Sequence, residues 1–530
     1  MSAEIYKTEK AKGPFDAIVI GSGIGGLATA ALLAKSGKAV LVLERHYVAG
    51  GFTHTFERKG YEWDVGVHYI GEVHRKNSTL RRILDYLTDG QLQWAKMNEV
   101  YDKAFFPDAS YEFVAGYEAF REKMCGYFPE EKKAIDTYLA LVRQLTKSTK
   151  SFFSERALPP WMAKLAHPFL SSDFLKLSRR TTWEVLSSLT QNKKLIAVLC
   201  AQYGDYGLPP KQSSFAIHAM IVNHYLDGAN YPVGGSSRFF ETIAPTIEKA
   251  GGKILVRADV AEILTHQNKA VGVRLQNGDE LKASLIVSDT GVVNTFTRLL
   301  KPETVQRIGY DQKLKKVNPS FAHLCLYIGL KHTAQELNLP QTNYWIFPDD
   351  DHDLAIDRYR QNSTASLPVT YISFPSAKDP SWEQKHPGRA TMEAIGFAPY
   401  EWFSKWENTK WRKRGEDYEQ LKKELSEQIL KNVYRHVPQV EGKIDYSELS
   451  TPLSTQHFAN YSKGEIYGLD HTPSRFEQTW LRPHTPIKNL YLTGQDIVSD
   501  GIAGAVFAGL LTASAILKKN VIKQILKGEG

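Results

Sequence analysis

A glycine-rich turn between two short apolar segments is the feature that most constrains how this chain folds. Residues 15–20 (FDAIVI) and 38–43 (KAVLVL) are runs of β-branched and other apolar residues, the composition of buried strands. The sequence GSGIGG between them places Gly21, Gly23 and Gly26 at the start of an expected helix over residues 24–35. This pattern predicts a strand–turn–helix–strand unit with parallel strands.

The three glycines have separate physical roles in such a unit. Gly21 permits the tight turn, Gly23 lets the backbone approach a pyrophosphate, and Gly26 allows the helix to pack closely on the strand. The helix N-terminus then faces the negative charge of the phosphates. Glu44 ends the second strand about 20 residues further on, where a carboxylate can accept hydrogen bonds from ribose hydroxyls. These features predict a Rossmann-type dinucleotide site.

A second glycine pair and the C-terminal region indicate which dinucleotide binds. Gly50-Gly51 follows the acid in ERHYVAGG, which resembles the fingerprint of the FAD-dependent amine oxidase and carotenoid desaturase superfamily. Residues 490–496 (LYLTGQD) and a helix over 501–517 match the C-terminal FAD segment of that superfamily. The resemblance implies FAD contacts at Gly21, Gly23, Ile24, Gly25, Gly26, Glu44, Arg45, Gly50, Gly51, Phe52, Thr53, Val260, Gly494, Asp496, Gly501, Ile502, Ala503 and Ala505.

The pattern also predicts how the chain is divided. A central block contains an expected helix over 237–250, strands over 253–256, 260–264 and 285–289, and a hairpin with an Asn277-Gly278 turn. The expected fold class is α/β. A discontinuous FAD-binding domain comprises residues 13–75, 230–300 and 480–530. A mixed α+β substrate domain comprises residues 76–229 and 301–479.

Further motifs narrow the family. GVHYIG at 66–71 and YGLDHTPSRF at 467–476, together with both FAD segments, resemble the all-trans-retinol 13,14-reductase (retinol saturase) family; carotenoid isomerases and phytoene desaturases are its relatives. This resemblance implies that flavin hydride transfer and a proton saturate a C=C bond of a conjugated polyene, a retinoid or another unsaturated lipid. No second G-x-G-x-x-G unit occurs, so NADPH or NADH, if it reduces the flavin, must dock at the same face; the alternative is an external donor that supplies the electrons.

The reaction needs a proton donor and a dry slot for an apolar substrate. The candidate donors are His68, Tyr69 and Glu72; Tyr231, Tyr467 and His471 are candidate pocket residues. Each has a structural alternative: a buried histidine bonded to backbone, a helix-start acid, core aromatics, or a turn formed by DHTP.

Three functions stay open at this point. The first is the polyene reductase, and the second is a carotenoid desaturase or a cis–trans isomerase that uses reduced flavin. The third is a non-catalytic lipid carrier of the same fold, similar to the GDP-dissociation inhibitors.

Composition limits the partners. The net charge of +8 is modest for 530 residues and no basic run resembles a nucleic-acid arm, so we expect no nucleic-acid partner. Cys125, Cys200 and Cys325 stand far apart, which argues against a disulfide framework or a metal site and favours a reducing cytoplasm. The first twelve residues are polar, lack the apolar core of a signal peptide, and are expected to form a frayed tail.

A basic and aromatic stretch suggests a membrane surface as a partner. Residues 143–180 carry eight Lys or Arg against two acids, interleaved with aromatic and aliphatic side chains. Residues 517–527 repeat this pattern as a helix with a lysine stripe and an apolar stripe. Both segments are typical of peripheral contact with anionic lipid, although a helix packed on its own domain gives the same pattern.

Overall fold

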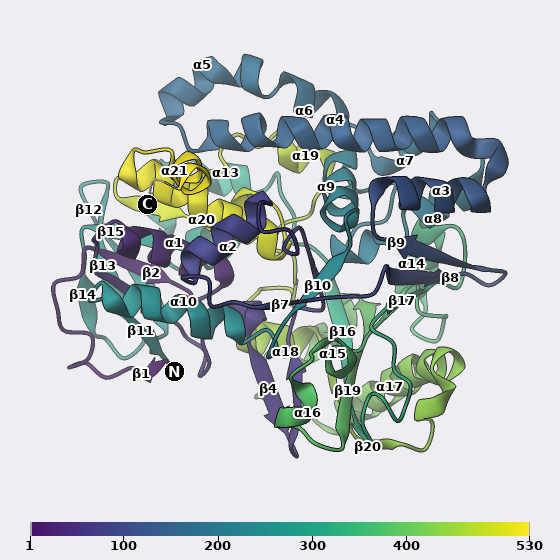
Figure 1. Ribbon diagram of the computed structural model, residues 1–530. Coiled ribbons are helices and arrows are strands. Elements are labelled where there is room, and N and C mark those ends of the chain that lie inside the picture. The colour runs from purple at the N-terminus through teal and green to yellow at the C-terminus, as the bar shows by residue number, and fades with distance from the viewer. Residues whose placement is uncertain (1–2, 529–530) are drawn as a thin grey trace.

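Six parallel strands form the sheet that contains the glycine-rich turn. The computed structural model describes residues 3–528, and strands from distant parts of the chain pair in this sheet (Figure 1). Val19 pairs with Val42 on one side and with Val287 on the other. The strands, in spatial order, are β1 (Glu4–Ile5), β11 (Lys253–Val256), β3 (Val40–Leu43), β2 (Ala17–Ile20), β15 (Leu285–Ser288) and β21 (Leu490–Leu492).

Three helices pack beside this sheet and bring the chain ends together. Helix α1 (Ile24–Lys35) packs against α20 (Gly501–Leu517) and α10 (Arg238–Lys249). A Cβ on Gly509 of α20 would lie 2.8 Å from the Cβ of Ala28, so the two helices approach at a glycine. The hydroxyl oxygen of Thr29 on α1 lies 2.9 Å from that of Thr493, which follows β21. The α/β fold class expected from the sequence is confirmed.

Three antiparallel strands extend the central block. They are β12 (Val260–His266), β13 (Lys269–Leu275) and β14 (Glu280–Lys282), and the Asn277-Gly278 turn connects the last two. The N-terminal tail differs from expectation, because Glu4 and Ile5 pair with β11 at the sheet edge.

A second, seven-stranded sheet forms the other large layer. Its β8–β17 pair is parallel and its other pairs are antiparallel. Among the helices beside it, α17 (Glu416–His436) packs on β18 and β19. The strand order is β20 (Ile444–Ser450), β16 (Ala322–Lys331), β19 (Arg389–Ala398), β18 (Thr370–Ser373), β17 (Asn343–Ile346), β8 (Val100–Phe105) and β9 (Ser110–Val114).

Two short segments lie on the other side of the expected domain boundary. Helix α2 (Thr79–Leu87) buries Leu80, Ile83 and Leu84 in the core around α1 and α10. The hairpin of β4 (Thr55–Arg58) and β5 (Tyr61–Asp64) leaves the FAD-binding part and packs on β19.

The C-terminal segment forms two helices that meet at a sharp angle near residue 517, where the expected helix over 501–517 ends. Helix α20 ends where Lys518 adopts a left-handed φ of 55°, and α21 (Val521–Lys527) continues at 109° to it. Val521 and Ile525 are buried, and α21 packs on α2, so its apolar stripe faces the protein. Within residues 3–528 no single helix is long and apolar enough to cross a membrane; α20 and α21 would pass that test only as a bent pair.

Candidate active site

A cavity of about 420 Å³ lies between the two sheets and receives side chains from both. The strand ends and glycine turns of the six-stranded sheet form one part of its wall, and aromatic residues of the seven-stranded sheet form another. Of the predicted FAD residues, those that line it are Gly21, Gly23, Ile24, Gly25, Glu44, Arg45, Gly51, Phe52, Thr53, Val260, Gly494, Asp496, Gly501, Ile502 and Ala505.

Three predicted FAD residues lie behind the cavity wall. Gly26 holds the turn, since a Cβ there would lie 2.6 Å from the Gly21 carbonyl oxygen. Gly50 has a φ of 120° and donates its N–H to the Ser22 hydroxyl at 3.0 Å. Ala503 packs on the core between α20 and the sheet. These residues shape the cleft and do not line it.

Glu44 is fixed at the end of β3 as a hydrogen-bond acceptor. Its Oε2 accepts the Ser22 N–H at 2.9 Å and the Ser22 hydroxyl at 2.7 Å, while Oε1 accepts the His46 N–H at 2.7 Å. A carboxylate oxygen has more than one lone pair, so Glu44 retains acceptor capacity toward the cavity. This arrangement fits the ribose of a dinucleotide.

The turn before α1 leaves no room for side chains. A Cβ on Gly51 would lie 2.9 Å from the Gly23 Cα, and a Cβ on Gly23 would lie 2.6 Å from Asp289 Oδ2. Asp289 follows β15 and was not singled out from the sequence; its burial raises its pKa to about 8. A glycine-lined backbone at a helix N-terminus fits a pyrophosphate, and together with Glu44 these residues fit FAD.

Asp496 has mainly a structural role. Its Oδ2 accepts the Val292 N–H at 2.7 Å and its Oδ1 accepts the Leu469 N–H at 3.1 Å. The side chain therefore ties the loop after β21 to two other loops, although the residue also borders the cavity.

The other end of the cavity is aromatic. Tyr467, predicted as a pocket residue, lines it and donates its hydroxyl to the Gly204 carbonyl at 2.8 Å, so its polar atom already has a partner. The wall on this side is completed by Tyr203, Phe321, His323, Tyr327, Trp345, Tyr371 and Phe397. Such a wall fits a flat apolar ligand.

His68 borders the cavity, and its Nδ1 lies 2.8 Å from Glu393 Oε2 on β19. Burial lowers the pKa of His68 to about 4, so the ring is neutral near pH 7. Of the three candidate proton donors, His68 is the one that reaches the cavity wall.

Tyr69 stands one layer behind the wall. Its hydroxyl donates to Asp205 at 2.7 Å and lies 3.1 Å from Asp102, and burial raises its pKa well above the usual value. Asp205 does line the cavity. Tyr69 therefore supports an acid in the wall and does not itself border the cavity.

The remaining predicted residues lie elsewhere. Glu72 is not a helix-start residue: it has a left-handed φ of 58°, lies outside the cavity, and its Oε2 is 3.2 Å from His224 Nδ1. His471 is fully buried and its Nε2 accepts the Asp500 N–H at 3.2 Å. Tyr231 is buried and bonds Asp64 through its hydroxyl. Neither His471 nor Tyr231 borders the cavity. Each has a buried polar partner instead, Asp500 for His471 and Asp64 for Tyr231.

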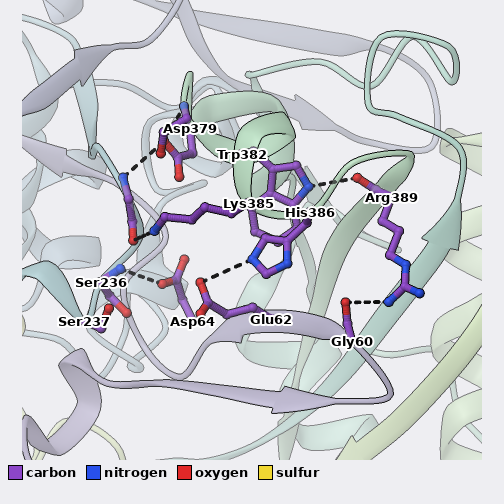
Figure 2. A network of polar contacts seen from close by, with 12 residues as sticks. Gly60, Glu62, Asp64, Ser236, Ser237, Asp379, Trp382, Lys385, His386 and Arg389 are labelled. Atoms are coloured by element: carbon purple, nitrogen blue, oxygen red, sulfur yellow. Dashed lines mark hydrogen bonds and ion pairs between the residues drawn. The ribbon is translucent and has the colours of Figure 1, made fainter. Parts of the chain in front are cut away.

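Figure 2 shows Asp64, Asp379 and Lys385 around the turn that precedes α10. Asp64 accepts the Ser236 N–H at 2.8 Å, Asp379 accepts the Gly234 N–H at 3.1 Å, and Lys385 donates to the Gly234 carbonyl at 2.9 Å. These contacts fix the turn before α10 against the end of β5 and residues 379–385. Sequence patterns could not separate this role from ligand binding, because a glycine pair before a helix serves either.

Within residues 3–528 no three His, Cys, Asp or Glu side chains cluster in a way that could hold a metal ion. The expectation of no metal stays a prediction.

A Rossmann-type sheet with a glycine-lined cleft that opens on an aromatic pocket defines a flavin-dependent oxidoreductase. The profile described as flavin containing amine oxidoreductase matches residues 24–517. All-trans-retinol 13,14-reductase of Danio rerio is 41% identical over 96% of this chain and 86% of its own length. The chain therefore belongs to the all-trans-retinol 13,14-reductase family, within the flavin-containing amine oxidoreductases.

More distant proteins share the architecture. Prolycopene isomerase 2 of an Oncidium hybrid cultivar is 26% identical over 97% of this chain and 85% of its own length. The structure of cyclohexylamine oxidase from Brevibacterium oxydans superposes with a TM-score of 0.61 at 17% identity, covering 96% of this chain and 99% of that one. The structural likeness supports the fold alone.

Proposed function

We propose that this protein saturates one C=C bond of a conjugated polyene lipid, with a retinoid as the leading substrate. The observation that carries the proposal is the single cavity that joins an FAD-fitting cleft to an aromatic wall. Membership in the retinol 13,14-reductase family supports the same reaction. When bound, FAD supplies the hydride for such a reaction.

The residues of this chain provide the rest of the chemistry. Tyr371, Trp345 and Phe397 form a wall that excludes water from an apolar substrate. His68 is neutral and borders the cavity, so we expect its ring N–H to reach a substrate carbon. A neutral imidazole can deliver one proton without placing a buried cation beside the polyene.

Two other functions fit the same cleft. A desaturase removes hydrogen from the substrate, and an isomerase moves a double bond without net electron transfer; the similarity to a prolycopene isomerase favours the isomerase as the second candidate. A lipid carrier would purify without flavin.

The test is anaerobic incubation of the dithionite-reduced protein with all-trans-retinol, a carotenoid and a polyunsaturated fatty acid in turn. A product heavier by two hydrogens supports reduction, and an isomer of unchanged mass supports isomerisation. A colourless purified protein without a flavin spectrum supports the carrier.

We also propose where an electron donor for the flavin binds. A second glycine-rich dinucleotide unit does not occur in the sequence, so we infer that NADPH or NADH, if it is the donor, enters the same cavity. Arg45 and Arg58 line that cavity and offer guanidinium groups to phosphate. Anaerobic bleaching of the flavin by either nucleotide tests this.

Membrane contact is proposed through α5 (Pro160–Leu170), which projects along the edge of the molecule in Figure 1. Trp161, Leu165 and Phe169 recur every fourth residue and are 67%, 68% and 85% exposed, with Met162 beside them. Lys164 lies among them, and its charge suits anionic lipid headgroups.

Several other members of the expected basic and aromatic patch are used internally. Phe152, Phe153 and Phe174 are buried, and the Arg156 guanidinium donates to the Leu481 and Ile497 carbonyls. The interfacial surface is therefore narrower than residues 143–180 suggest.

We also propose that the protein resides in the cytoplasm. The three cysteines are free thiols, and Cys200 and Cys325 are buried without a disulfide partner, as expected of a reducing compartment.

A further inference from the structure

Two charged residues that no sequence motif marks stand behind His68. Glu393 on β19 is fully buried, and its Oε1 has no hydrogen-bond partner among the residues that the structure describes. Lys378 ends α15 (Pro375–Lys378) and donates from Nζ to the His68 carbonyl and to the Ser373 hydroxyl, each at 2.9 Å. The cavity-facing imidazole is thus backed by a buried carboxyl group with a buried amine beside it.

The carboxyl group retains a proton near neutral pH. Burial raises the pKa of Glu393 to about 8, although the Lys378 cation acts in the opposite direction. Burial lowers the pKa of His68 to about 4 and that of Lys378 to about 7. The short Nδ1–Oε2 contact is therefore a hydrogen bond that a protonated Glu393 donates to a neutral His68.

This hydrogen bond fixes the tautomer of the histidine. Because Nδ1 accepts, the ring proton is on Nε2, which makes no hydrogen bond within the described part of the chain. The His68 side chain is 16% exposed, whereas Glu393 is 0% exposed. The imidazole is therefore the cavity end of the pair, and Glu393 is the interior end.

Other titratable groups surround the pair on every side. Asp64 from β5 faces both His68 and Glu393, and its burial raises its pKa to about 6. The groups that face the pair from β16, β18, β10 and α15 are His323, Cys325, Tyr327, Tyr371, Tyr231 and Lys378. Among them Lys378 is the one that forms a cation, so it is the group that stabilises a Glu393 carboxylate.

We propose that Glu393 is a positioning residue that holds His68 in the Nε2–H tautomer and replaces the proton that His68 gives to the substrate. This inference rests on the proposed reduction. In the step, the substrate carbon that carries the electron pair forms a C–H bond as the Nε2–H bond breaks. Nδ1 then takes the proton of Glu393, whose carboxylate charge faces Lys378. One proton moves from the pair to the product, and charge is conserved.

The first test uses the flavin-loaded protein and infrared difference spectra recorded across a pH titration. A protonated carboxyl signal should titrate near pH 8 in the native protein. Glu393→Gln should lose the Glu393 component of that signal, while the component of Asp289, whose pKa is also about 8, remains. In Lys378→Gln the midpoint should move to higher pH, because the lysine charge normally lowers the pKa of Glu393. Glu112→Gln removes a carboxylate of the same sheet that is paired with Lys123 at the surface, and it should leave the signal unchanged.

The second test is the rate of product formation against pH. We expect Glu393→Gln to lower the rate by about 100-fold and to remove the decline that the native protein shows above about pH 8. Identical infrared titrations in the native protein and Glu393→Gln would overturn the inference, as would an unchanged pH profile. If the native protein reduces no polyene while the carboxyl signal is present, the proposed function fails and the hydrogen-bonded pair stands.

Discussion

Ser22 donates both its backbone N–H and its hydroxyl to one carboxylate oxygen of Glu44, at 2.9 and 2.7 Å. The contact joins the glycine-rich turn after β2 to the end of β3, so the two predicted halves of the nucleotide site hold each other in place. A ribose acceptor that is fixed before binding loses little freedom when the cofactor binds.

Replacing Glu44 by glutamine should therefore weaken FAD binding. The amide presents N–H donors where Ser22 and His46 also donate, so hydrogen bonds to a charged acceptor are lost. We expect a cost of about 2 kcal/mol, or ~30-fold in Kd, measured by quenching of flavin fluorescence. Glu57→Gln, at an exposed position on β4, is the control. Equal affinities in both variants would contradict the assignment.

The nucleotide site was predictable because its signals are local. The spacing of Gly21, Gly23 and Gly26 and the position of Glu44 fall within one strand–helix–strand unit, and the expected strands match the observed ones within two residues. These residues form the nucleotide site largely with their own backbone. A short stretch of sequence is therefore enough to predict it.

The aromatic end of the cavity, with the residues behind His68, was predictable only in part, because distant segments of the chain assemble it. GVHYIG marked His68, but Glu393, Lys378 and Asp205 each look ordinary in their own segments. Their chemistry arises from burial beside one another, which only the second sheet creates. Glu72 failed as a candidate for the same reason, since adjacency in sequence to His68 did not bring it to the cavity.

His68→Gln should separate chemistry from cofactor binding. We expect the rate of substrate reduction to fall by about 100-fold or more, because the amide cannot donate a proton, while flavin content stays unchanged. Glu72→Gln should retain the native rate, since Glu72 pairs with His224 away from the cavity. The measurement is the rate of product formation, followed by mass spectrometry. A larger loss of rate in Glu72→Gln than in His68→Gln would contradict the assignment of His68 as the proton donor.

The contribution of three buried aspartates to stability should become less favourable as pH rises from about 4 to about 8. Burial raises the pKa of Asp64 to about 6, of Asp500 to about 7 and of Asp289 to about 8, against roughly 3.9 for an unfolded aspartate. The native state thus binds more protons than the unfolded state between these values. Their contribution to the free energy of unfolding then decreases with pH, by up to about 1.4 kcal/mol per unit for each such group.

Asp289→Asn keeps the shape of the protonated acid and removes this proton. Its free energy of unfolding, from urea denaturation between about pH 5 and 8, should decline less steeply than that of the native protein. Parallel pH curves for the two proteins would show that Asp289 is ionised in the folded state.

The exposed face of α5 should be needed for membrane binding. A triple variant, Trp161→Ser, Leu165→Ser and Phe169→Ser, should lose co-sedimentation with vesicles that contain phosphatidylserine. Leu354→Ser, at an apolar position on α14 (His352–Gln361) that is 40% exposed, should sediment like the native protein. Vesicle binding that survives the triple variant would place the membrane contact elsewhere.

We propose that the protein adds two hydrogens to a conjugated polyene. The most direct measurement is an anaerobic single turnover with dithionite-reduced flavin, free of excess dithionite, and one equivalent of all-trans-retinol. The absorbance of oxidised flavin and the product mass are followed together. We expect one equivalent of flavin to be oxidised for each product that is heavier by two hydrogens. Flavin that stays reduced beside an isomer of unchanged mass would contradict the account.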